Sequence, residues 1–175
     1  YRFSLIRMEN YYYNLIQVVV YAGDEIRLSQ TSELLKKKKS EISVVAETIK
    51  LDEFLKYIRQ HKPELIILAL TEQDAPILSI LEQHVDKEFE IVIICDSEKL
   101  AMQAIRLHVL QYLTTPVSIQ DIDKMISVFY VKSNRWLNNN RNNIEKQTPH
   151  SISKKILIPT ASEYHLLSVY SDRKS

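Results

Sequence analysis

Glycine is almost absent from this chain of 175 residues, which contains Gly23 and no second glycine. A loop that cradles a phosphate group needs several glycines, because the backbone must approach the ligand closely. A glycine-rich nucleotide-binding loop is therefore excluded. Serine and histidine also never occur in the context of a nucleophile elbow, so the sequence indicates no enzymatic activity.

Cysteine is equally scarce, since Cys95 is the single thiol. One cysteine excludes a disulfide framework and a thiol-rich zinc site, and it suits a reducing compartment. The five histidines show no ligand spacing. Asp24, Glu25, Glu72 and Asp74 fall near one edge of the predicted sheet, but they form no coordination pattern. We therefore expect no metal and no other cofactor, and we expect Cys95 to be an inert core residue.

A net charge is also lacking, because 23 basic residues stand against 22 acidic ones. A formal charge of +1 supplies no overall field to hold nucleic acid or an anionic membrane. The run Lys36 to Lys39 ends a predicted helix, where cations interact well with the helix dipole. The first 16 residues lack the features of a secretory signal. The predicted location is the cytoplasm, without membrane contact.

The most informative stretch that is present runs from Lys62 to Glu72, with the sequence KPELIILALTE. Its unbroken apolar run is typical of a parallel strand with helices on both faces. Ligands of such sheets bind beyond the carboxyl ends of the central strands. Here that end is marked by Ala69, which carries no functional group.

The rest of the chain repeats a rhythm of strand and helix. Strands are predicted at residues 17–22, 42–47, 65–70, 90–95 and 109–113, and helices follow each of them. The fourth helix is marked by Leu100, Ala101, Ala104 and Ile105. The last begins with Ser118 as N-cap and Asp121 at its third position, and extends to about residue 136. Short connections between alternating elements predict a doubly wound parallel α/β sheet.

Composition divides the chain into four parts. Residues 1–16 have no clear period and are predicted to be a leader, and residues 17–137 form the α/β domain. Residues 138–154 are polar and aperiodic, which is typical of a linker. Residues 155–175 hold two short apolar segments that predict a hairpin, a short C-terminal β extension that needs a partner for stability.

Three passages show a family resemblance: KPELIILAL, IVIICDSEKLAMQAI and VLQYLTTPVSIQDIDKMI. Over residues 17–135 the chain resembles the receiver domain of bacterial response regulators, which implies a flavodoxin-like sheet with the strand order 2-1-3-4-5. The segment KKILIPTASEYHLLSVY is similar to the opening strands of the LytTR DNA-binding domain. This resemblance implies that DNA is bound only through a C-terminal domain, most of which is expected to lie beyond residue 175.

The resemblance also shows what this chain has lost. Receiver domains carry a phosphoacceptor aspartate at the end of the third strand, and Ala69 takes that position. The acidic pair that helps to hold Mg²⁺ corresponds to Ala22 and Gly23, with Asp24 as the next acidic residue. The sequence therefore predicts a pocket without an acceptor and with an incomplete metal site.

The two remaining pocket positions are altered as well. The threonine or serine of the fourth strand corresponds to Cys95, which is a poorer hydrogen-bond donor. The lysine before the proline corresponds to Thr115, and the resemblance implies a cis bond from Thr115 to Pro116. We interpret the domain as a pseudo-receiver, for which a histidine kinase is a doubtful partner.

Interaction is the function that remains. The resemblance places a dimerisation face on the fourth helix, fifth strand and fifth helix, with five residues in or beside it: Gln103, Arg106, Gln111, Asp121 and Lys124. Arg106 or Lys124 of one subunit could meet Asp121 of the other in a homodimer.

The sequence leaves two alternatives open. One is a phospho-switch with a displaced acceptor, such as Asp74 or Asp96. The other is a flavodoxin-like domain that binds a small molecule.

Overall fold

The computed structural model describes residues 15–83, 88–145, 154–159 and 164–169, and it describes side chains as far as residue 133. Most of the predicted leader, residues 1–16, lies outside the described residues. The chain divides into two compact units, with the boundary between Asp123 and Lys124. Each unit is considered by itself.

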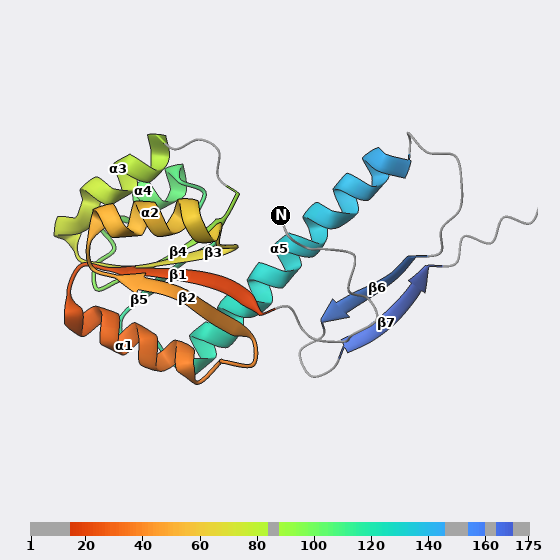
Figure 1. Cartoon of the computed structure of the whole chain (residues 1–175), viewed down its shortest axis with the longest axis horizontal. Coiled ribbons are helices and arrows are strands. Elements are labelled where there is room, and N and C mark those ends of the chain that lie inside the picture. The colour runs from red at the N-terminus through yellow and green to blue at the C-terminus, as the bar shows by residue number, and fades with distance from the viewer. Residues whose placement is uncertain (1–14, 84–87, 146–153, 160–163, 170–175) are drawn as a thin grey trace, which may run out of the picture. The chain divides into compact units, whose positions relative to one another are not determined.

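The first unit is built on a five-stranded parallel sheet with the order β2-β1-β3-β4-β5 (Figure 1). The predicted doubly wound α/β fold and its strand order are therefore confirmed. The strands are β1 (Ile16–Ala22), β2 (Ile42–Thr48), β3 (Leu65–Leu70), β4 (Glu90–Cys95) and β5 (Gln111–Thr114).

Helices cover both faces of this sheet. Figure 1 shows α1 on one face and α2, α3 and α4 on the other, as right-handed crossovers between parallel strands require. The helices of the first unit are α1 (Glu25–Lys36), α2 (Leu51–His61), the short 3₁₀ helix η2 (Glu72–Asp74), α3 (Ala75–Gln83), α4 (Ala101–Arg106) and the start of α5 (Ile119–Glu145).

The central strand has the burial that its composition predicts. All six residues of β3 are buried, because helices cover it from both sides. Its side chains alternate between two layers, and Ile66, Leu68 and Leu70 join the cluster formed with Phe54 of α2 and Leu78 of α3. This packing fixes the carboxyl end of β3, and Ala69 with it.

One position of the predicted apolar stripe of α4 and the predicted start of the next strand are wrong. Leu100 and Ala104 are buried as expected, but Leu107 is the next buried residue and Ile105 is 65% exposed. The strand that follows begins at Gln111 instead of Val109. The physical reason is a turn at His108, which has a φ of 52°.

The N-terminus of α5 confirms the predicted cap. The Asp121 carboxylate accepts hydrogen bonds from the backbone N–H and the hydroxyl of Ser118, at 2.9 and 2.7 Å. The helix continues to Glu145, well past residue 136, and no glycine or proline interrupts it. Residues 138–145, which were predicted to belong to a linker, are therefore helical. Within the described ranges, no helix is long and apolar enough to cross a membrane.

The second unit contains a separate two-stranded sheet. Strand β6 (Lys154–Pro159) pairs with β7 (Tyr164–Val169) in antiparallel register, from Lys154 opposite Val169 to Pro159 opposite Tyr164. This pairing confirms the prediction that the two apolar segments associate. The likeness to a LytTR domain stays a prediction.

Candidate functional site

The predicted pocket residues meet at the carboxyl edge of the parallel sheet. Ala22 lies opposite Ala69 in the register of β1 and β3. The backbone N–H of Gly23 donates to the Ala69 carbonyl at 2.9 Å, and the N–H of Thr115 donates to the Cys95 carbonyl at 3.1 Å. The positions inferred from the resemblance are thus neighbours in space.

A cleft of about 670 Å³ opens beside this edge. One wall is formed by α1, and the other by Thr115, Pro116 and Val117, with a cis bond between Thr115 and Pro116 as expected. Ala69 and Ile94 also line the cleft. Ala69 is 2% exposed and offers only a methyl group. The cleft therefore has no phosphoacceptor at the end of the central strand.

The side chain of Asp74 fills the space beside Gly23. A Cβ atom added to Gly23 would lie only 2.9 Å from the Cγ atom of Asp74 and would therefore collide with the Asp74 carboxylate. That carboxylate is held in place, because it accepts hydrogen bonds from the N–H and the hydroxyl of Thr71 at 2.7 and 2.8 Å. A side chain at position 23 would therefore have to displace this carboxylate from both hydrogen bonds.

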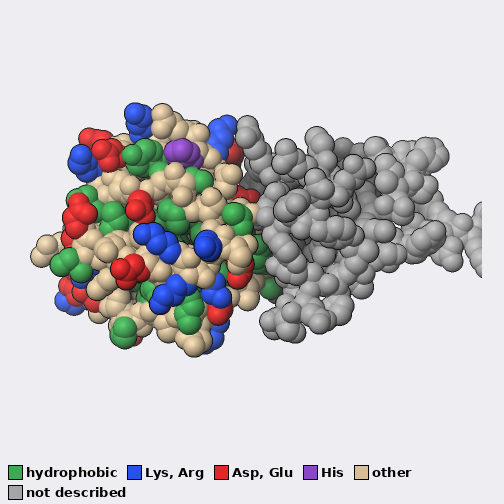
Figure 2. Space-filling view, turned by 60° about the horizontal axis from the view of Figure 1, so that its bottom comes forward, with side chains coloured by type: hydrophobic (Ala, Val, Ile, Leu, Met, Phe, Trp, Pro, Cys, Tyr) green, Lys and Arg blue, Asp and Glu red, His purple; other side chains and the backbone are tan. Residues whose placement is uncertain are grey.

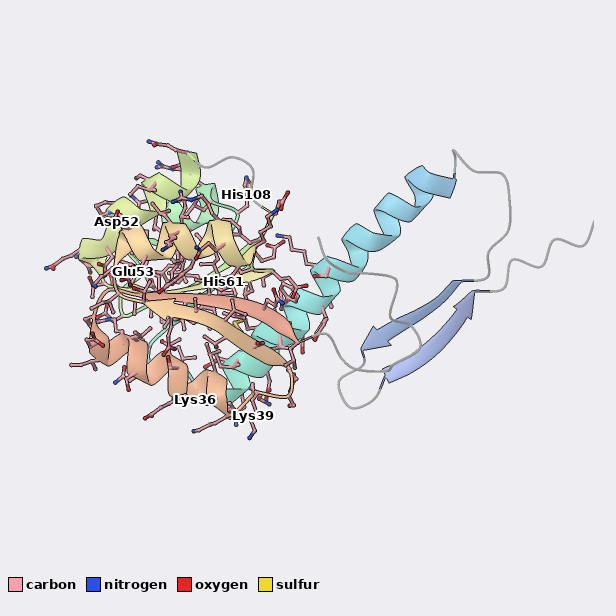
Figure 3. The ribbon with its side chains drawn as sticks, in the orientation of Figure 1. Lys36, Lys39, Asp52, Glu53, His61 and His108 are labelled. Carbon is pink, nitrogen blue, oxygen red and sulfur yellow. The ribbon has the colours of Figure 1, made fainter. Side chains whose placement is uncertain are left out.

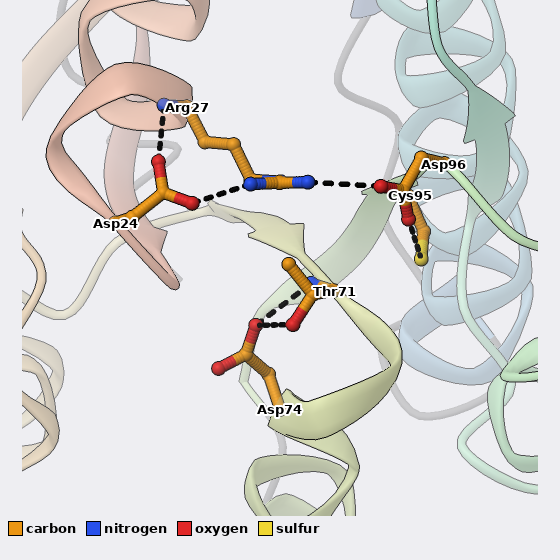
Figure 4. A network of polar contacts seen from close by, with 6 residues as sticks. All are labelled: Asp24, Arg27, Thr71, Asp74, Cys95 and Asp96. Carbon is orange, nitrogen blue, oxygen red and sulfur yellow. Dashed lines mark hydrogen bonds and ion pairs between the residues drawn. The ribbon is translucent and has the colours of Figure 1, made fainter.

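An arginine joins two carboxylates across the site. Arg27, in the first turn of α1, donates from Nη1 to Asp24 and from Nη2 to Asp96 at 2.9 Å (Figure 4). Its backbone N–H also donates to Asp24, which is the N-cap of α1, at 2.8 Å. We call this three-residue contact the Arg27 bridge. It ties the start of α1 to the loop after β4.

The charges in the bridge stabilise one another. The backbone N–H of Arg27, followed by its guanidinium, lowers the pKa of the Asp24 carboxyl below its usual range. Burial alone would lower the pKa of Arg27, but the bonds to Asp24 and Asp96 raise it overall. Arg27 was missed at the sequence level. Its place three residues after Asp24 is a local signal that could have indicated the contact with Asp24, whereas the contact with Asp96 is visible only in the fold.

The donor set does not fit the divalent cation that the resemblance implies. Magnesium requires several oxygen ligands in near-octahedral array. Across residues 15–83 and 88–133, no group of three histidine, cysteine, aspartate or glutamate side chains could hold a metal ion. Both carboxylate oxygens of Asp24 already accept hydrogen bonds from Arg27.

The loop that joins β4 to α4, residues 96–100, makes two further contacts. Lys99 Nζ lies 2.9 Å from the carboxylate of Glu72 in η2, and this bond lowers the pKa of Glu72. The hydroxyl of Tyr112 in β5 donates to the carbonyl of Ser97, and burial raises the pKa of that hydroxyl. Side chains from α1, η2 and β5 therefore all hold this loop.

Cys95 is a core residue, as expected. It is fully buried in the cluster that contains Leu100 and Ala104. Its sulfur lies 3.8 Å from Asp96 Oδ1, within reach of a weak hydrogen bond. A packed thiol of this kind has no access to a ligand in the cleft.

The residues of the predicted dimer face lie on three elements. Gln103 and Arg106 belong to α4, Gln111 to β5, and Asp121 and Lys124 to successive turns of α5. The side-chain oxygens of Gln103 and Gln111 are buried without a hydrogen-bond partner. The sequence did not reveal that two apolar residues of α4, Met102 and Ile105, are each 65% exposed.

The basic run at the end of α1 forms no site of its own. Figure 3 shows Lys36 and Lys39 pointing away from the sheet, as expected for a solvated helix end. Lys38 instead pairs with Asp123. On the face shown in Figure 2, basic, acidic and apolar side chains are interspersed.

Comparison with known proteins identifies the fold. The response regulatory domain of protein mrkE from Klebsiella pneumoniae superposes with a TM-score of 0.57 and 18% identity, over 68% of this chain and 98% of that one. A signal receiver domain from Desulfovibrio desulfuricans G20 gives 0.57 and 15%, over 69% and 98%. A LuxR-family DNA-binding response regulator from Staphylococcus aureus gives 0.53 and 18%, over 66% and 98%.

No family model and no curated protein matches the sequence. At these low identities, the structural likeness establishes the receiver-domain fold of response regulators and leaves the role of individual residues open.

Proposed function

We propose that this chain is a pseudo-receiver, a receiver-like domain of a cytoplasmic transcriptional regulator that acts without phosphorylation and without enzymatic activity. The observation that carries the proposal is Ala69, whose methyl group stands at the end of the central strand in the cleft. An alkyl group cannot accept a phosphoryl group. The presence of Gly23 in place of an acidic residue and of Thr115 in place of a lysine supports the same conclusion.

The displaced acceptor is the weaker alternative. Asp74 is held as the cap of η2 by two hydrogen bonds from Thr71, both to Oδ2. Both oxygens of Asp96 are engaged, one by Arg27 and one by Cys95. A carboxylate must be free at one oxygen to attack a phosphoryl donor in line. The contacts of Asp96 therefore oppose such a reaction.

In this proposal the domain works as a dimerisation module. Met102 and Ile105 are three residues apart on α4 and hence share one side of the helix. Two exposed apolar side chains beside the exposed Arg106 form a surface that a second copy of the chain could cover. Arg106 or Lys124 of one subunit would meet Asp121 of the other, and such charges set register more than affinity.

Light scattering of the 175-residue chain over a range of concentrations tests this module. We expect a dimer, and Ile105→Asp or Arg106→Glu should weaken it, the former by about tenfold or more. Ile26→Asp is the matched control, because Ile26 is an isoleucine that is 70% exposed on α1, across the sheet from α4. A strict monomer, or equal weakening by Ile26→Asp and Ile105→Asp, would contradict the proposed face.

The C-terminal segment completes the proposal. The antiparallel pair of β6 and β7 supports an interpretation of residues 155–175 as the start of a LytTR-type DNA-binding domain. The similar protein from Staphylococcus aureus is itself described as a DNA-binding response regulator. DNA would be bound by that C-terminal domain only, and the receiver-like domain would position it.

A second candidate function rests on the cleft. Its volume of about 670 Å³ is within the range of small-molecule pockets. Binding of the dye 8-anilinonaphthalene-1-sulfonate would test it, with Gln30→Glu in the cleft compared with Ser29→Glu outside it. The two substitutions add the same charge to the chain. If the dye binds in the cleft, Gln30→Glu should weaken its binding more than Ser29→Glu does.

A further inference from the structure

We propose that Arg27 takes the place of a bound divalent cation, and that its guanidinium holds the loop of residues 96–100 in one position. The metal-exclusion part of this inference is independent of the proposed function. Its consequence for α4 rests on the proposed dimerisation through that helix.

The position of the guanidinium carries the first step. The resemblance implies a cation held by acidic residues at the end of β1, and the carboxylates that follow β1 and β4 in this chain are Asp24 and Asp96. Nη1 and Nη2 of Arg27 bind one carboxylate each (Figure 4). A planar guanidinium offers paired donors to carboxylates and never loses its charge near neutral pH. The positive charge of the site is therefore supplied by the side chain of Arg27.

The carboxylate of Asp74, which also lies beside Gly23, is directed elsewhere. Asp74 Oδ2 accepts both hydrogen bonds from Thr71 and caps η2, while the carboxylate fills the space beside Gly23. Asp24 and Asp96 alone provide two ligands, which suffice for weak binding of a metal ion once Arg27 is removed but not for one that would have to displace Arg27.

The second step concerns the loop itself. Three of its residues are held from three directions: Asp96 by Arg27 of α1, Ser97 by Tyr112 of β5, and Lys99 by Glu72 of η2. The loop leads directly into α4, which begins at Ala101. Because every one of these contacts is made by the chain's own side chains, the position of α4 needs neither a metal nor a phosphoryl group.

The inference is tested by nuclear magnetic resonance of the full chain with Mn²⁺ as the probe. The paramagnetic ion should leave residues 24–27 and 96–97 of the wild type unaffected. Arg27→Ala frees both carboxylates and should allow Mn²⁺ to broaden those signals selectively. Arg59→Ala is the control, because it removes an equal charge from α2. Asp96→Asn added to Arg27→Ala should abolish the broadening.

Hydrogen exchange measures the holding of the loop in the same samples. Arg27→Ala should accelerate exchange in residues 96–100 by roughly two- to fivefold, which matches the loss of partly exposed ion pairs. Arg27→Gln provides a second variant should the alanine substitution unfold the protein. Arg59→Ala should leave the rate unchanged.

Three results would overturn the inference. Selective broadening in the wild type, or none in Arg27→Ala, would show that Arg27 does not replace a cation. Unchanged exchange in both Arg27 variants would show that it does not hold the loop. A monomeric wild type in light scattering would instead reject the proposed function and leave the metal-exclusion result intact.

Discussion

The carboxylate of Asp74 occupies the space in which a side chain on Gly23 would begin. Two hydrogen bonds from Thr71 keep it there, so the carboxylate cannot turn away without losing them. The residue after β1 and the start of η2 are thus matched to each other. A glycine at position 23 leaves this space to the Asp74 carboxylate.

Gly23→Ala should lower the stability of the domain by about 1 to 2 kcal/mol, because the new methyl group forces Asp74 out of its two hydrogen bonds. Urea denaturation followed by circular dichroism measures the change. In an Asp74→Ala background the collision is removed, and Gly23→Ala should then cost less than about 0.5 kcal/mol. Equal losses in both backgrounds would show that the two residues are not coupled.

Arg27→Gln tests the pH dependence of the Arg27 bridge. The pKa of Asp24 is lowered in the folded state, so the stability that the bridge adds is fully present above the unfolded value of about 3.9. It is lost as the pH falls through the lower folded pKa. The bridge is partly exposed, so we expect a stability difference of no more than about 1 kcal/mol between wild type and variant.

That difference should be constant between neutral and mildly acidic pH and should disappear in strong acid. Chemical denaturation at a series of pH values would reveal it. A difference that persists when Asp24 is protonated would mean that Arg27 stabilises the fold through packing and not through charge.

Glu64→Gln should have the opposite pH dependence. Burial raises the pKa of Glu64, although the N–H of Gln17 donates to its carboxylate at 3.1 Å. A raised folded pKa means that Glu64 contributes most below its unfolded value of about 4.3, and that this contribution is lost as the pH rises.

The amide that Glu64→Gln introduces could still accept the hydrogen bond through its oxygen, and it carries no charge to desolvate. We therefore expect the Glu64→Gln variant to be more stable at neutral pH, on the order of 0.5 kcal/mol, with no gain in acid. Thermal unfolding at the two pH values measures the effect. Glu33→Gln, at an exposed position of α1, should show no such gain.

The sequence predicted those features of the fold that depend on periodicity and local chemistry. The apolar run of β3, the cap formed by Ser118 and Asp121, and the strand order implied by the family resemblance are all present. The start of β5 was predicted at Val109 instead of Gln111, because the turn at His108 has a left-handed backbone conformation and the sequence has no glycine there to indicate it.

The sequence could predict which strand ends meet at the candidate site, but not the side-chain contacts formed there. Ala69, Cys95 and Thr115 meet at one edge because the register of parallel strands brings them there. The contact of Arg27 with Asp96 spans 69 residues and depends on side-chain geometry, which has no periodic signal. The exposure of Ile105 likewise has no signal in the sequence, because the apolar pattern assigned this residue to the core.

The most direct test of the account is the intact mass of the chain after treatment with acetyl phosphate and Mg²⁺. A domain with Ala69 at the end of β3 and Arg27 between Asp24 and Asp96 should remain unmodified. A phosphoryl adduct that maps to Asp74 or Asp96 would contradict the account and establish a displaced acceptor.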